Sequence, residues 1–393
     1  MLQIVAGSYD GHLLGYKCPS SQQKQDQGPV QHLFAFAAHS SCVRDAAAAQ
    51  HILVTSSTDI SIGVHDLKKN RTYGNLNQEF GAGAINSLDF FSTTHLLAGA
   101  DDGDVSVWRT SDWECLLRMK GHKGPVHCVS VHPSGRLALS VADDSKLMLW
   151  NLMSGKCNYT VALSQPARLV LWAPGGDTFI VGTGAGVELH TLQGSSAPYT
   201  LSHKGGPPLA ASFASPNLLI TGGEKVCGLQ LWNVDSRTRI RKYDSVHVAR
   251  IKAIESIVIN GQCVVVTGSS DGSINVWKVI GDLPAKAMLE SLHTISTRVR
   301  LTCLAVSLAS VSSQRTITSY THPRSDEESD ESERGRISTG NSAFGAKTQP
   351  PEEKKKQKKG EKKVRAVVQR KRREESGTQS GDEPKGILKK KKI

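Results

Sequence analysis

Several functional signatures are missing from this 393-residue chain. Its eight cysteines include no pair at C-x-x-C spacing, which excludes a zinc ribbon and a thioredoxin-type redox motif. No apolar run approaches the roughly 20 residues that cross a bilayer, and the segment from Met1 to Tyr9 lacks the basic start of a signal peptide. We therefore expect no membrane association, and free thiols in a reducing compartment, the cytosol or the nucleus.

Motifs of catalysis and of cofactor binding are also missing. Ser154-Gly155-Lys156 lacks the first glycine of a phosphate-binding P-loop. The glycine-rich run 182–186 follows a strand-like segment, but strand-like residues 187–190 come next, where a dinucleotide motif requires a helix. We find no nucleophile elbow and no His/Cys cluster with metal-ligand spacing. The sequence predicts a protein that is not an enzyme and that binds no cofactor or metal.

The charge of the chain is concentrated at one end. The formal net charge is +12, and residues 311–393 hold 22 Lys and Arg against 13 Asp and Glu. Residues 1–310 are therefore nearly neutral. This asymmetry indicates a globular body with an arm that meets polyanions.

A short segment that ends in an aromatic residue or a histidine recurs through the body. The copies end at Tyr16, His65, Trp108, Trp150, His190, Trp232 and Trp277. A period of about 40–45 residues with a strand that ends in Trp is typical of WD40 β-propellers, which have four strands per blade. We therefore predict an all-β fold, a seven-bladed WD40 β-propeller over residues 1–310, which acts as a monomer.

Aspartates in tight turns support the register of the repeat. In five copies an aspartate lies six residues before the terminal aromatic residue or histidine: Asp10, Asp59, Asp102, Asp144 and Asp271. Asp and Gly suit such hairpins because they bridge or tolerate positive φ angles. The copies that end at His190 and Trp232 lack this aspartate.

One copy shows which residues would join a polar network. Proteins with this repeat place a histidine, a Ser or Thr, the turn Asp and the Trp in a hydrogen-bonded network within the blade. By this resemblance the network residues are His122, Ser140, Asp144 and Trp150, together with Asp102 and Trp108, and Asp271 and Trp277, of two other copies. His39, His203 and His247 could serve other blades in the same way. An imidazole between Asp and Ser also resembles a hydrolytic triad, but its recurrence along the repeat favours a structural role.

The two ends of the body each lack part of a blade. The first copy begins at its second strand, and residues 299–306 form an apolar strand with no blade after it. We predict that residues 299–307 pair with the N-terminal strands and close the ring, because closure removes free sheet edges.

The arm is expected to be disordered and to have two parts. Residues 311–346 form an acidic, Ser-rich linker, in which Ser325, Ser329 and Ser332 are candidate sites for an acid-directed kinase. A linker without modification is the alternative. Residues 347–393 hold 18 basic and 7 acidic residues, which favours nuclear targeting or electrostatic contact with RNA, with a purely solubilising tail as the alternative. The basic residues are Lys354, Lys355, Lys356, Lys358, Lys359, Arg370, Lys371, Arg372, Arg373, Lys389, Lys390, Lys391 and Lys392.

Local sequence extends the likeness beyond a generic WD repeat. Residues 113–126, 132–141 and 149–152, the opening Ile4–Tyr9 and the turn 269–272 resemble the family of PAK-interacting WD-repeat proteins. The resemblance covers nearly the whole ring and the Lys-rich character of the arm.

This resemblance implies two functions. Members of the family are nucleolar factors of large ribosomal subunit biogenesis and pre-rRNA processing. They are also described as negative regulators that bind the regulatory region of p21-activated kinase. The basic arm favours the first role, in the nucleus and nucleolus, with pre-ribosomal particle proteins and pre-rRNA as partners. A substrate receptor of a ubiquitin ligase is a weaker alternative, because no third strand is followed by the Trp-Asp-x-Arg pattern.

Overall fold

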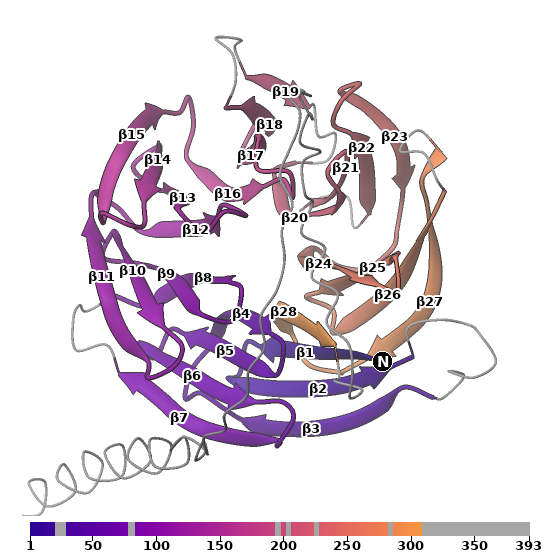
Figure 1. Cartoon of the computed structure of the whole chain (residues 1–393). Helices are drawn as coiled ribbons and strands as arrows, with labels where there is room; N and C mark the ends of the chain where they lie inside the picture. The colour runs from indigo at the N-terminus through magenta and orange to yellow at the C-terminus, as the bar shows by residue number, and fades with distance from the viewer. Residues whose placement is uncertain are drawn as a thin grey trace, which may run out of the picture. The chain divides into compact units, whose positions relative to one another are not determined.

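The computed structural model describes residues 1–19, 29–77, 83–192, 198–201, 206–223, 228–281 and 286–308. These residues form seven four-stranded antiparallel sheets, which stand around a central channel as the blades of a propeller (Figure 1). The prediction of an all-β, seven-bladed propeller is confirmed. The linker and the basic arm lie outside the described residues, and so do all the candidate phosphorylation and targeting residues in them.

Each blade is a meander that starts at the channel. We number the blades 1 to 6 in chain order from β4, and blade 7 contains the N-terminus. The innermost strands are β4 (Val43–Ala49), β8 (Ile85–Phe91), β12 (Val126–Val131), β16 (Ala167–Trp172), β20 (Pro208–Ser215), β24 (Ile251–Ile259) and β28 (Leu301–Leu308). The second strands are β5 (Ile52–Ser57), β9 (His95–Ala100), β13 (Leu137–Ala142), β17 (Thr178–Thr183), β21 (Leu218–Gly223), β25 (Gln262–Ser269) and β1 (Leu2–Ser8).

The third strands carry the repeat marker, and the outer strands form the rim. The third strands are β6 (Ser61–Asp66), β10 (Asp104–Arg109), β14 (Lys146–Asn151), β18 (Gly186–Thr191), β22 (Leu229–Asn233), β26 (Ser273–Ile280) and β2 (His12–Cys18). The outer strands are β7 (Arg71–Asn77), β11 (Glu114–Lys120), β15 (Lys156–Ala162), β19 (Tyr199–Leu201), β23 (Thr238–Tyr243), β27 (Met288–Ser296) and β3 (Gln31–Ala37).

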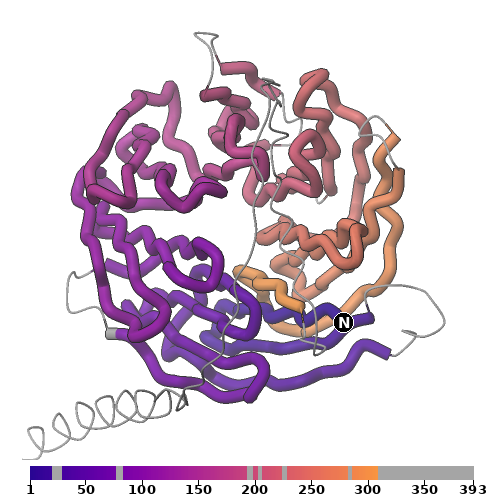
Figure 2. The backbone as a smooth tube through the Cα atoms, in the orientation of Figure 1, coloured from indigo at the N-terminus to yellow at the C-terminus, as the bar shows by residue number. Residues whose placement is uncertain are grey.

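The two ends of the ring meet in blade 7. Its sheet order is β28-β1-β2-β3, so the last described strand lies beside the N-terminal strands (Figure 2). β28 is antiparallel to β1, with Leu2 opposite Leu308 and Ala6 opposite Leu304. β28 also packs against β4 on one side and β24 on the other. The predicted closure by residues 299–307 is therefore confirmed, and every inner strand has an inner strand on either side.

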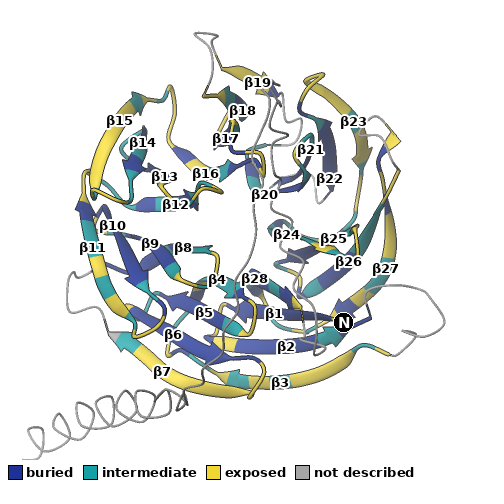
Figure 3. Ribbon diagram, viewed as in Figure 1, coloured by how far each residue is buried: buried dark blue, intermediate teal, exposed yellow. Residues whose placement is uncertain are grey.

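Burial follows the position of a strand in its blade. The second and third strands are mostly buried, because they lie between neighbouring blades, whereas β7 and β15 on the rim are mostly exposed (Figure 3). The core consists of apolar clusters in the spaces between adjacent blades, such as the one that joins Val107 of β10 to Trp150 of β14. Such a scaffold holds loops and channel residues in place, which is where binding usually occurs.

Candidate partner-binding face at the channel entrance

The residues of the polar network come together in blade 3. The Nδ1 of His122 lies 3.0 Å from an oxygen of Asp144, and its Nε2 lies 2.7 Å from the Oγ of Ser140. The indole Nε1 of Trp150 donates to the same Oγ at 2.7 Å. Ser140 is completely buried and Trp150 nearly so, and burial lowers the pKa of His122, although Asp144 acts to raise it. The imidazole therefore links a turn to the core.

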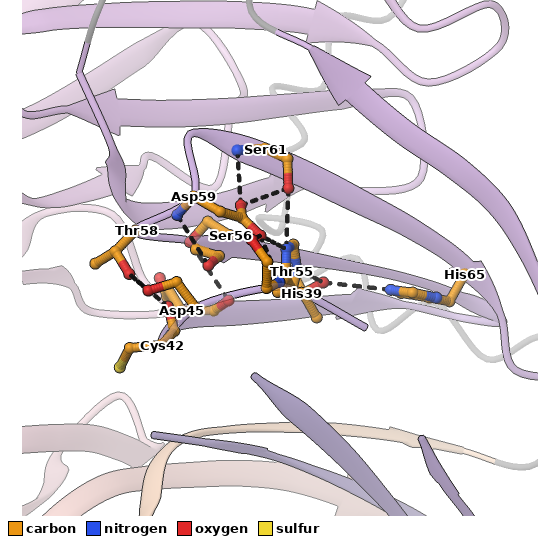
Figure 4. Close-up of polar contacts among 12 residues, drawn as sticks. His39, Cys42, Asp45, Thr55, Ser56, Thr58, Asp59, Ser61 and His65 are labelled. Carbon is orange, nitrogen blue, oxygen red and sulfur yellow. Dashed lines mark hydrogen bonds and ion pairs between the residues drawn. The ribbon is translucent and has the colours of Figure 1, made fainter. Parts of the chain in front are cut away.

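Blade 1 contains the same network, with Thr55 at the position of Ser140 and His65 at that of the tryptophan (Figure 4). The Nδ1 of His39 lies 3.2 Å from Asp59 and 3.0 Å from the Oγ of Ser61, while its Nε2 lies 2.9 Å from the Oγ1 of Thr55. His65 replaces the tryptophan, and its Nε2 is 3.3 Å from the Oγ1 of Thr55.

In blade 6 a serine lies between the histidine and the aspartate of the network. In blade 6 the Nδ1 of His247 meets the Oγ of Ser273 at 2.6 Å, and that hydroxyl donates to Asp271 at 2.5 Å. The Nε2 of His247 and the indole Nε1 of Trp277 both contact the Oγ1 of Thr267, at 2.9 and 3.1 Å. Burial acts to raise the pKa of Asp271, but hydrogen bonds from Ser273 and two backbone amides lower it to about 2.

Blade 2 holds its two candidate residues apart. Ala98 stands where blade 3 has Ser140, so the indole of Trp108 donates to Ser106 instead, at 2.9 Å. Asp102 accepts the amide of Asp104 at 3.1 Å and pairs with Arg118 at 2.8 Å. His203 lies outside the described residues. Because the His–hydroxyl–Asp arrangement recurs in three blades, we interpret it as an element of the fold.

A β-bulge at the start of every inner strand shapes the channel entrance. In each of the seven blades the register shifts by one around the second residue of the inner strand. Bulges redirect side chains, and all seven of these residues line the channel, a cavity of about 650 Å³. We call them the channel collar: Arg44, Asn86, His127, Arg168, Leu209, Lys252 and Thr302.

The collar is rich in cations. Arg44 and Arg168 are exposed at the entrance, Lys252 is half-buried, and the Nε2 of His127 lies 2.6 Å from Asp143. Sequence reasoning missed the collar because each member is an isolated residue in its own repeat. Only an alignment of the seven copies on their inner strands would have placed these residues at one position.

Carboxylates line the channel below the collar. Asp45 accepts the amide of Leu88 at 2.7 Å, and Asp89 accepts the amide of Val131 at 2.7 Å, so each joins its blade to the next. Burial raises the pKa of Asp45 to about 6 and that of Asp89 to about 7. Burial among the strands and then the charges of Asp45 and Asp89 also raise the pKa of Glu255, but its side chain is exposed to the channel, so water limits the rise.

Exposed residues in the loops beside the collar add hydrophobic and aromatic surface. The guanidinium of Arg300 lies 5.0 Å from the centre of the Tyr9 ring, a cation–π contact, and Tyr9 is half exposed. Val248, in the loop before β24, is 91% exposed. These residues lie in loops on the same face as the collar, because inner strands begin and second strands end there. The face can bind a protein or a polyanion, and among the described residues no group of three or more His, Cys, Asp or Glu could hold a metal ion.

Comparisons with known proteins agree with the architecture. Residues 74–109, 113–151 and 245–278 match the family of the WD domain, G-beta repeat. The chain is 34% identical to a zebrafish (Danio rerio) p21-activated protein kinase-interacting protein 1-like over 307 residues, which is 78% of this chain and 80% of that protein. It is 30% identical to human p21-activated protein kinase-interacting protein 1 over 80% of this chain and 79% of that protein. Shk1 kinase-binding protein 15 of Schizosaccharomyces pombe is 27% identical over 80% of this chain and 86% of its own length.

Proposed function

The chain belongs to the p21-activated protein kinase-interacting protein 1 family of non-enzymatic WD-repeat scaffolds, and on this premise we propose that it is a nucleolar assembly factor of the large ribosomal subunit. The observation that carries the proposal is the basic arm, with 18 Lys and Arg against 7 Asp and Glu in residues 347–393. Dense cations without stacking aromatics suit contact with RNA phosphates that does not depend on sequence. The proposed partners are pre-ribosomal proteins, on the collar face, and pre-rRNA, on the arm.

In this proposal the arm binds RNA and the ring binds protein. An arm that neutralises about six phosphates would give a slope of log K against log salt near −4, on the single-strand value of about 0.7 per contact. The collar face would set which protein is bound, since a ring of fixed cations rewards a complementary acidic surface. RNA affinity should therefore fall steeply with salt and depend on the arm.

Sedimentation of nuclear extract through a sucrose gradient tests this function. Full-length protein should sediment with precursors of the large subunit and accumulate in the nucleolus, and a chain that lacks residues 311–393 should do neither. A matched pair of point variants then tests the ring. Arg168→Glu in the collar should weaken sedimentation with the particle, whereas Arg136→Glu, also exposed but at the opposite end of the inner strands, should not. Full-length protein that stays in light cytoplasmic fractions would refute the assembly role.

Kinase regulation is the second candidate. It is favoured by the names of the human and fission yeast relatives, which are described as kinase-interacting and kinase-binding. Co-precipitation of the full chain with the regulatory region of a p21-activated kinase, and lower kinase activity in its presence, would support it. The Arg168→Glu and Arg136→Glu pair would show whether the collar face is used for that contact.

A further inference from the structure

Between neighbouring blades there is a wedge, where the end of a third strand faces the outer strand of the preceding blade. In four blades an indole fills it. Each indole packs in the same apolar cluster as an outer-strand side chain of the preceding blade: Trp108 with Leu76, Trp150 with Met119, Trp232 with Leu201, and Trp277 with Ile240. The repeat thus shows which chemical group this space accommodates.

Blade 1 has an imidazole at this position, and its wedge is open. A cavity of about 380 Å³ lies there, and its lining includes Phe34, Phe36, Leu53, His65, Leu67 and Arg71. The centres of the Phe36 and His65 rings are 5.6 Å apart, in an edge-to-face arrangement. The Nδ1 of His65 lies 3.1 Å from the Oγ1 of Thr72 and its Nε2 lies 3.3 Å from that of Thr55, so the imidazole is held in place and cannot swing into the cavity.

Blade 4 also has a histidine in place of the tryptophan, but it fills the space differently. Phe179 lies opposite His190 on the neighbouring strand, and the two rings stack with centres 4.9 Å apart and planes 8° apart. In blade 1 the residue opposite His65 is Leu53, which has no ring to stack. The open wedge therefore follows from two positions together, His65 and Leu53.

We propose that the wedge between blades 7 and 1 is an anchor site for an aromatic side chain of a partner peptide, with an acidic residue beside it. The rings of Phe34 and Phe36 offer faces and edges to an incoming indole or phenyl ring, which buries roughly 150–250 Å². The guanidinium of Arg71, exposed at the mouth, suits a neighbouring carboxylate. The carboxylate of Asp66 does not compete, because it accepts the amides of Lys68 and Lys69 and the hydroxyl of Tyr73.

This anchor site is separate from the collar. It lies on the rim, where β3 and β7 are the outer strands, whereas the collar lies on the inner strands. The two can be occupied at once, so the inference does not rest on the function proposed above.

Selection of a random 12-residue peptide library on the full-length protein tests the inference. We expect the enriched peptides to carry Trp, Phe or Tyr next to Asp or Glu. They should bind at least about tenfold more weakly to two variants that close the wedge than to the wild-type protein. His65→Trp restores the repeat, and Leu53→Phe copies blade 4. Arg71→Ala should weaken binding about threefold to tenfold, and Arg168→Glu in the collar should leave it unchanged.

The variants also separate loss of the site from loss of the fold. Indole alone, added to the wild-type protein, should raise its melting temperature, whereas the two wedge-closing variants should melt at or above the wild-type temperature and gain less from indole. Enriched peptides without an aromatic residue, no enrichment at all, or equal binding to wild type and to both folded variants would each overturn the inference.

Discussion

Ser140 provides a sharp test of how the polar network stabilises a blade. Its hydroxyl contacts the Nε2 of His122 and the indole N–H of Trp150, each at 2.7 Å, and the residue has no exposed surface. In Ser140→Ala both nitrogen groups would stay buried without their partner. Each buried polar group left unsatisfied costs about 1–3 kcal/mol, so for the two groups together we expect a loss of about 2–6 kcal/mol in the free energy of unfolding.

The repeat supplies the control for this test. Thr55, Thr221 and Thr267 occupy the position of Ser140 in three other blades, and the hydroxyl of each contacts a ring nitrogen at the end of its third strand. Ser140→Thr should therefore stay within about 1 kcal/mol of wild type, because it keeps the hydroxyl and adds one methyl group. Urea unfolding of the full chain, followed by tryptophan fluorescence and circular dichroism, measures both. If Ser140→Ala costs less than about 0.5 kcal/mol, or if Ser140→Thr costs as much as Ser140→Ala, the network does not stabilise the blade as argued.

Three further predictions concern closure, pH and an unpaired indole. A chain that ends before Val299 lacks β28, so in a thermal scan it should aggregate or have a melting temperature far below that of wild type. A chain that ends after Ser310 should have the melting temperature of wild type. Because burial raises the pKa of Asp89 from its ordinary value of 3.8 to about 7, the stability that its protonated form provides is fully present below about pH 4 and is lost as the pH rises from there through 7. The free energy of unfolding of Asp89→Asn should therefore exceed that of wild type by on the order of 1–3 kcal/mol at pH 8 and by little at pH 4, as urea unfolding at both values would show. The indole N–H of Trp172 is buried and has no hydrogen-bond partner among the described residues, so Trp172→Phe should cost at least about 1 kcal/mol less than Trp150→Phe, measured by the same unfolding curves.

The fold was predictable because its signals repeat. The Trp-ended strand and the turn aspartate recur at nearly constant spacing, so a weak copy such as the one that ends at His190 is still located by its neighbours. Ring closure was predictable for a related reason. The missing inner strand at one end and the surplus strand at the other complement each other, and β28 pairs with β1 as that complementarity requires.

The two candidate binding sites were less predictable, because neither is a motif. The open wedge of blade 1 depends on His65 and on Leu53 opposite it, together with Phe34 and Phe36 on β3, the outer strand of the preceding blade. A histidine in place of the repeat's tryptophan indicates a smaller side chain between two blades and therefore a gap. Blade 4 has the same replacement, but there Phe179 stacks on the histidine and fills the gap. Pairing between strands therefore decides whether a cavity remains.

The collar shows how a repeated backbone irregularity creates a surface that no single repeat encodes. Residues 1 and 3 of each inner strand pair regularly with the second strand, and the bulge between them leaves residue 2 free of that pairing. Its side chain therefore lines the channel in all seven blades. Arg44 and Arg168 are exposed there, so these two positions can vary at little cost to the core. Repetition then places seven variable side chains around one axis, and in this chain Arg44, Arg168 and Lys252 make that ring positive. A partner on this face contacts one residue from every blade. Substitution of the exposed Arg44 or Arg168 should therefore change the choice of partner while leaving the free energy of unfolding within about 0.5 kcal/mol of wild type, as is usual for surface positions.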